Sequence, residues 1–113
     1  MASMRELLNE FYNYVKFWKE ASPNQVNAFI QLLESVEAPK ALDKKIKELI
    51  AVALAVNAHC PWCIAYHVSE ALKAGATPDE IREAAWVAVL MGGGPNLSYM
   101  ILVEKAIEEF SKK

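Results

Sequence analysis

Two cysteines and a histidine lie close together near the middle of the sequence, as Cys60-Pro61-Trp62-Cys63 with His67 four residues later. Pro61 suits the first position of a helix, where the N–H that proline lacks would have no partner within the helix. Cys60 is then the N-cap, and Cys60, Cys63 and His67 fall on one helix face. The spacing therefore predicts a dithiol beside an imidazole at the start of a helix.

This arrangement favours redox chemistry. The positive end of a helix dipole stabilises a thiolate, and an imidazole four residues on can accept the proton of Cys63. A second thiol can then convert an oxidised sulfur into a disulfide. The N-cap position favours Cys60 as the attacking thiol, whereas the imidazole favours Cys63. Because a base offers proton transfer as well as electrostatic stabilisation, we take Cys63 as the attacking thiol and Cys60 as its disulfide partner.

The same residues allow two other interpretations. His59, Cys60, Cys63 and His67 are all ligands that zinc accepts, which makes a metal-binding module the main rival. Four ligands within nine residues seldom close a tetrahedron, however. Alternatively, the cysteines are small apolar residues of a scaffold without redox function. The fold of thioredoxin, another CxxC protein, is not expected because its motif needs strands, and no segment here alternates apolar and polar residues for long enough.

Composition limits the partners. The 113 residues carry a net charge of −2 with both signs mixed, so we expect no nucleic-acid binding. The longest apolar run, 49–58, is shorter than the roughly 20 residues of a membrane span, and the first ten residues do not resemble a signal peptide. We therefore expect a cytoplasmic protein that binds no membrane. An apolar fraction of 54% on a short chain also suggests apolar surface buried between subunits.

The sequence predicts helices from end to end. Ser3 with Glu6, and Thr77 with Glu80, fit capping boxes, and Ser22 before a proline predicts a further N-cap. We predict a single domain of residues 1–113 with six helices near residues 4–21, 23–37, 43–58, 61–75, 78–91 and 95–111.

Further expectations concern the ends of two of these helices and the burial of one of them. Asp43 is a plausible N-cap of the helix 43–58, and Gly75 is expected to end the helix 61–75 in a left-handed conformation. The helix 43–58 is expected to form the buried centre through a stripe of residues at helical spacing, namely Ile46, Leu49, Ile50, Ala53, Leu54 and Asn57.

From about residue 42 to residue 95, the sequence resembles the carboxymuconolactone decarboxylase / AhpD-like superfamily, on its alkylhydroperoxidase side. The resemblance rests on Lys47-Glu48-Leu49-Ile50 and the small apolar run after it, and on the Cys60-x-x-Cys63-x-x-x-His67 motif. It continues through residues 71–81 (Ala-Leu-Lys-Ala-Gly-Ala-Thr-Pro-Asp-Glu-Ile) and the turn at residues 91–95 (Met-Gly-Gly-Gly-Pro).

The resemblance implies an all-α, AhpD-like bundle of about six helices that assembles into homo-oligomers, either trimers or hexamers. It implies reduction of a hydroperoxide, or dithiol–disulfide exchange, with an external dithiol as reductant and with no metal or organic cofactor. Catalysis would use the cysteine pair, His67 and an upstream glutamate, which is Glu48 here. The family's decarboxylase branch typically lacks the cysteine pair, which makes a non-redox decarboxylase-like protein the alternative.

Trp62 and Glu48 both bear on this expected catalytic site. Trp62 stands where the best-characterised peroxidase of the family has a second histidine, and His59 is the candidate substitute. Glu48 adjoins a helix face of small apolar residues, where a carboxylate must be paired or have a shifted pKa. Beside His67 it would orient the ring, whereas a salt bridge to Lys44 or Lys45 would make it a structural residue.

Overall fold

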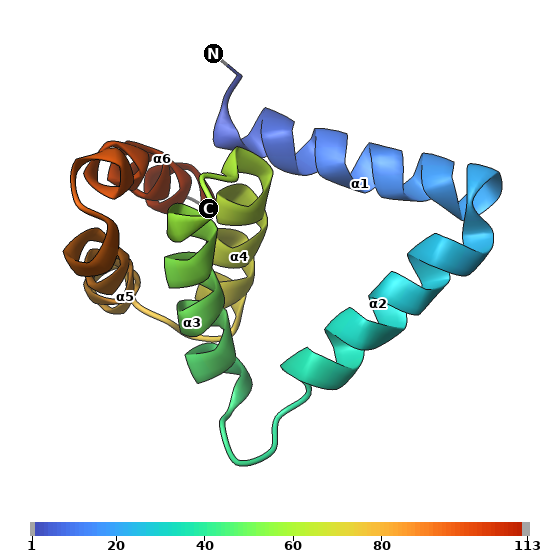
Figure 1. The fold of residues 1–113 in the computed structure, drawn as a ribbon, viewed down its shortest axis with the longest axis horizontal. Helices are drawn as coiled ribbons and strands as arrows, with labels where there is room; N and C mark the ends of the chain where they lie inside the picture. The colour runs from blue at the N-terminus through green and yellow to red at the C-terminus, as the bar shows by residue number, and fades with distance from the viewer. Residues whose placement is uncertain (1, 112–113) are drawn as a thin grey trace.

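The computed structural model describes residues 2–111, which form six α-helices and no β-strand. This confirms the all-α prediction, and each helix begins and ends within two residues of its expected bounds. The helices in chain order are α1 (Met4–Ala21), α2 (Pro23–Glu37), α3 (Lys44–Asn57), α4 (Pro61–Lys73), α5 (Pro78–Gly92) and α6 (Gly94–Ser111) (Figure 1).

Most of the predicted helix ends are present. The capping boxes at Ser3 and Thr77 form with both reciprocal hydrogen bonds, and the Asp43 side chain accepts from the backbone N–H of Ile46. Gly75 has a φ of +94°, as expected after the end of α4. Ser22 is the N-cap residue of α2 with Pro23 at the first helical position, as predicted, but its side chain makes no cap hydrogen bond. This residue is shared by two helices, and its backbone N–H donates to the carbonyl of Trp18 at the end of α1.

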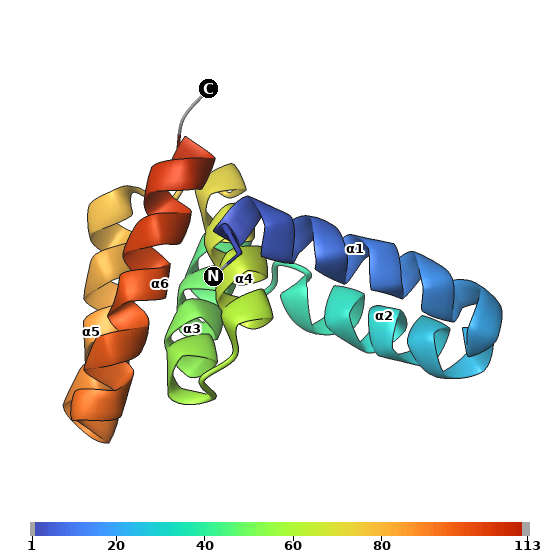
Figure 2. The ribbon, with the colours of Figure 1, turned by 90° about the horizontal axis from the view of Figure 1, so that it is seen from above.

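Helices α3, α4, α5 and α6 pack together, and α1 crosses α4 at one side of this group (Figures 1 and 2). Fully buried side chains between them include Val52 and Val56 of α3, Ile64 and Val68 of α4, and Val103 of α6. Burial of such aliphatic side chains contributes about 1.5–3 kcal/mol each and fixes the helices relative to one another. The packed α3–α4 pair is the frame on which the cysteine motif rests.

Helix α2 has a different environment. It meets α1 at Ser22 and diverges from it, so that α1, α2 and the α3–α4 pair enclose a triangle in Figure 1. None of its residues is buried in the described chain, although it carries large apolar side chains such as Phe29 and Leu32. Its C-terminal end contacts α3, which brings Glu37 to the edge of the bundle.

The predicted buried stripe of the helix 43–58 is wrong for most of its residues, although Leu49 and Ala53 pack against the core. Ile46, Ile50 and Leu54 are exposed, and α3 buries instead the opposite set Glu48, Val52, Ala55 and Val56. These three residues of the apolar stripe therefore face away from the core, as do Leu90 and Met91 of α5. No helix among residues 2–111 is both long and apolar enough to cross a bilayer.

Candidate redox site

The turn between α3 and α4 positions the cysteine pair. His59 has a φ of +54°, which reverses the chain after α3, and the backbone N–H of Cys60 donates to the carbonyl of Ala55 at 3.3 Å. Cys60 is the N-cap of α4, with Pro61 at the first helical position, as the sequence predicts. The motif is thus held by the end of one buried helix and the start of the next.

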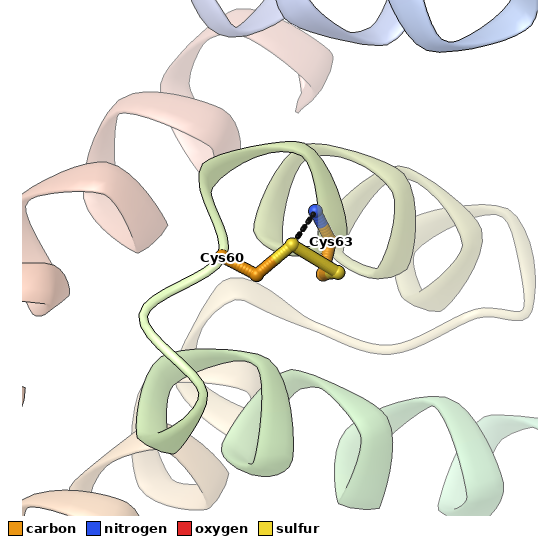
Figure 3. The surroundings of a disulfide bond; sticks show 2 residues. All are labelled: Cys60 and Cys63. Atoms are coloured by element: carbon orange, nitrogen blue, oxygen red, sulfur yellow. Dashed lines mark hydrogen bonds between the residues drawn. A yellow bond between two sulfur atoms is a disulfide. The ribbon is translucent and has the colours of Figure 1, made fainter.

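Cys60 and Cys63 are joined by a disulfide bond (Figure 3). Their Cα atoms are 5.2 Å apart, a separation that a disulfide spans without moving the backbone. The sulfur of Cys60 also accepts the backbone N–H of Cys63 at 3.1 Å, so it lies where the helix start presents its partial positive charge. The structure therefore shows the oxidised form of a dithiol at a helix N-terminus.

His67 lies one turn beyond Cys63 and contacts Glu48 of α3. The distance from His67 Nδ1 to Glu48 Oε1 is 2.7 Å, and Glu48 is 0% exposed. Because an ionised carboxylate only accepts hydrogen bonds, the hydrogen lies on Nδ1, which leaves Nε2 as the basic nitrogen of the ring. This contact orients the imidazole and places a buried carboxylate beside it.

The alternative pairing of Glu48 with a lysine is wrong. Lys44 contacts Glu70 at 3.2 Å, and Lys45 contacts Glu80 at 3.1 Å. Burial by itself raises the pKa of Glu48, but the hydrogen bonds from His67 and from the Glu37 carboxyl outweigh it. The pKa of Glu48 therefore lies below its ordinary value, and the group is a buried carboxylate at neutral pH.

Glu37, the last residue of α2, is a member of the site that sequence analysis did not identify. Its Oε2 lies 3.9 Å from His67 Nδ1, and its side chain is 15% exposed. Burial, followed by the neighbouring carboxylate of Glu48, raises its pKa to about 8. Glu37 and Glu48 come from different helices and share no sequence pattern, so only the fold brings them together at His67.

His59 and Trp62, the other two residues of interest in the motif, bond elsewhere. The His59 ring stacks on Tyr99 with centroids 4.5 Å apart, and its Nε2 lies 2.8 Å from Asn96 Oδ1. Trp62 Nε1 donates to Glu10 of α1 at 2.7 Å. The histidines proposed as shared zinc ligands are therefore engaged with different helices, His59 with α6 and His67 with α3.

Comparison with known proteins places this geometry in a family. The family model "carboxymuconolactone decarboxylase family" matches residues 23–105. A crystal structure of a member of that family from Legionella pneumophila superposes with a TM-score of 0.93 at 38% identity, covering 96% of this chain and 97% of that one. A second member of the family, from Thermotoga maritima, has a crystal structure that superposes with a TM-score of 0.83 at 26% identity, covering 92% of this chain and 89% of that one. The description of that protein suggests a role in an antioxidative response.

Relatives known by sequence span more than this chain. A protein of the cox locus of Paracoccus denitrificans is 52% identical over 60% of this chain, which amounts to 61% of its own length. The alkyl hydroperoxide reductase AhpD of Coxiella burnetii is 26% identical over 81% of this chain and 51% of its own length. Together with the match over residues 23–105, these similarities show that the chain belongs to the carboxymuconolactone decarboxylase family, with AhpD among its relatives.

Proposed function

We propose that this protein is a thiol-dependent oxidoreductase that reduces hydroperoxides through Cys63 and Cys60. The observation that carries the proposal is the Cys60–Cys63 disulfide at the N-terminus of α4, with His67 one turn along the same helix and in contact with Glu48 of α3. A dithiol needs a base, a stabilised thiolate and a resolving thiol in order to cycle, and these residues supply all three. The distant relative AhpD is an alkyl hydroperoxide reductase, which agrees with this chemistry.

The first half of the cycle oxidises Cys63. His67 Nε2 accepts the proton of the Cys63 thiol, and Glu48 stabilises the imidazolium through Nδ1–H. The thiolate attacks the terminal peroxide oxygen, the O–O bond breaks, and the leaving alkoxide takes the proton from His67 to become an alcohol. Cys63 is then a sulfenic acid, oxidised by two electrons.

The second half restores the thiols. The Cys60 thiol attacks the sulfenic sulfur and gives its proton to the departing hydroxyl, which leaves as water, and the disulfide of Figure 3 forms. An external dithiol then reduces this disulfide through two exchange steps and is itself oxidised. The residues that would act are Cys60, Cys63, His67 and Glu48, and no step requires a metal or an organic cofactor. A reducing compartment such as the cytoplasm would supply the dithiol.

The exposed apolar surface supports assembly of several copies, and we propose a homo-oligomer, a trimer or a hexamer. Helix α2 buries none of its residues within the described chain. Leu90 and Met91 of α5 are 81% and 79% exposed, and Leu54 of α3 is 62% exposed. Large apolar side chains gathered on several helices are typical of surfaces that pack against another subunit.

A choice of oxidant separates peroxide reduction from plain disulfide exchange. We expect the reduced protein to be oxidised by cumene hydroperoxide at least about tenfold faster than by hydroxyethyl disulfide at equal concentration, because the His67 proton assists the leaving alkoxide. Stopped-flow fluorescence of Trp62, one residue from Cys63, would follow both reactions. Faster reaction with the disulfide would instead assign the protein to dithiol–disulfide exchange.

A further inference from the structure

Glu37 completes a group of three ionisable side chains that the mechanism above uses only in part. One ligand-type atom from each of Glu37, Glu48 and His67 lies within 4.8 Å of the others. His67 Nδ1 is committed to Glu48 Oε1 at 2.7 Å, with its hydrogen between the two atoms. A metal ion would need that nitrogen without its hydrogen, so the group is better suited to hold a proton than a cation.

The surroundings of the second carboxylate oxygen of Glu48, Oε2, indicate which residue carries this proton. Glu48 is fully buried, and with both carboxyl groups ionised its Oε2 has no hydrogen-bond partner. A buried carboxylate oxygen without a donor is unfavourable, and two ionised carboxylates side by side repel each other. A proton on Glu37 removes both problems, because its O–H can donate to Glu48.

We propose that Glu37 is a positioning residue of the redox site, a carboxylic acid that keeps its proton at neutral pH and donates it in a hydrogen bond to the Glu48 carboxylate. Glu37 then holds Glu48 in place for His67 without adding a second negative charge beside the imidazole. This role rests on the proposed function, since Glu48 and His67 are there assigned to activate Cys63. The protonation state itself can be tested without any turnover.

The surroundings of Glu37 agree with a retained proton. Burial is the main cause of its pKa of about 8, and the charges of Glu48 and Glu70 raise it further, whereas Lys44 lowers it. Lys44 is held by Glu70 at 3.2 Å, which limits its effect. The phenol of Tyr66, also nearby on α4, has a raised pKa and stays neutral. Lys47 Nζ donates to the carbonyls of Val36 and Ala38 on either side of Glu37 in the chain.

Loss of the Glu37 proton is expected to change the rate of Cys63 oxidation in one direction. Below about pH 8, with Glu37 protonated, the negative charge beside His67 Nδ1 is that of the Glu48 carboxylate. As the pH rises through about 8, Glu37 loses its proton to solvent and adds a negative charge 3.9 Å from His67 Nδ1. This second negative charge opposes the loss of the Cys63 proton to solvent. The rate of oxidation should therefore rise less steeply above pH 8 than a simple thiol titration predicts.

Infrared difference spectroscopy of the reduced protein tests the protonation directly. We expect a carbonyl stretch of a protonated carboxylic acid at pH 7 that disappears with a midpoint near pH 8. It should be absent in Glu37→Gln and present in Glu34→Gln, a matched control because Glu34 is an exposed residue one turn earlier on α2. Carboxyl-carbon NMR of the unmutated protein with labelled glutamate should show one glutamate titrating in the same range. No such glutamate, or a band that survives in Glu37→Gln, would overturn the proposal.

Rate measurements test the consequence for Cys63. Glu37→Gln keeps an N–H donor for Glu48 but cannot ionise, so its rate should follow a single titration without the change of slope near pH 8. Glu37→Ala removes the donor and should be slower at every pH, with Glu37→Gln restoring much of the loss at pH 7. Equal pH profiles for all three proteins would refute the role at the redox site. If the infrared band is found but no variant reacts with peroxide, the proposed function fails and the proton assignment stands.

Discussion

Replacing Cys63 by serine is expected to abolish oxidation of the protein by hydroperoxide, with a loss on the order of 10³-fold or more, as when other enzymes lose their nucleophile. A serine hydroxyl is not ionised at neutral pH, and His67 at the next turn of α4 cannot make it a comparable nucleophile. Cys60→Ser should behave differently: it should consume one equivalent of peroxide and stop at a sulfenic acid on Cys63. Trapping with dimedone, followed by mass spectrometry, distinguishes the two variants.

The comparison must use the reduced wild-type protein, because neither serine variant can form the Cys60–Cys63 disulfide. Thermal unfolding of all three reduced proteins controls for loss of fold. The reverse pattern, with Cys60→Ser inert and a sulfenic acid formed on Cys60 in Cys63→Ser, would make Cys60 the attacking thiol. In that case the N-cap position, rather than the imidazole, would determine reactivity.

Replacing His67 by glutamine is expected to slow oxidation by about 10²–10⁴-fold, the usual contribution of a positioned general acid–base. Glu48→Gln should cost less, because the amide oxygen can still accept the hydrogen of His67 Nδ1 but no longer stabilises the positive ring. Since the pKa of Glu48 lies below its ordinary value, its charge is present across the neutral range. The rate of Glu48→Gln should therefore be reduced throughout that range rather than shifted at one pH.

Glu70→Gln provides a matched control for these changes. Glu70 lies one turn beyond His67 on α4 and pairs with Lys44, so the substitution removes a nearby carboxylate without removing the contact at His67 Nδ1. Its rate should stay within a few-fold of wild type. If Glu70→Gln were as slow as Glu48→Gln, the effect of Glu48 would reflect the general charge of the region and not its contact with His67.

The helices could be predicted from the sequence because most of their ends are encoded locally. Ser3, Asp43 and Thr77 each cap a helix through their own side chains, and such bonds depend on residues three positions away. The contact between Cys60 and Cys63 is equally local. Ser22 also stands at the N-cap position of α2, but its side chain makes no cap hydrogen bond, and its backbone N–H closes the end of α1 instead.

Burial was harder to predict than helix position. Ile46, Ile50 and Leu54 form an apolar stripe but are exposed in the described chain, while the face that contains Glu48 is buried. Periodicity reveals an apolar face without saying what covers it, and a protein with apolar surfaces on several helices has more than one such face. Glu48 itself was identified only through the resemblance to the family, and the structure then brought it to His67.

Glu37 illustrates what sequence reasoning could not reach. It ends a helix none of whose residues is buried, eleven residues before Glu48, and no motif connects the two. Its proximity to His67 arises only from the angle at which α2 returns to the bundle. Its raised pKa depends on the partial burial of its own side chain and on a carboxylate from another helix, neither of which a local pattern records.

The most direct test of the redox assignment is the intact mass of the fully reduced protein, with thiol alkylation, before and after one equivalent of an organic hydroperoxide. The Cys60–Cys63 pairing predicts rapid loss of the mass of two hydrogens, with both cysteines protected from alkylation. Reduction by a dithiol should then restore both thiols. Two thiols that remain free after exposure to the hydroperoxide, and that are alkylated slowly, would contradict it. They would indicate a buried or metal-bound pair instead of a catalytic dithiol.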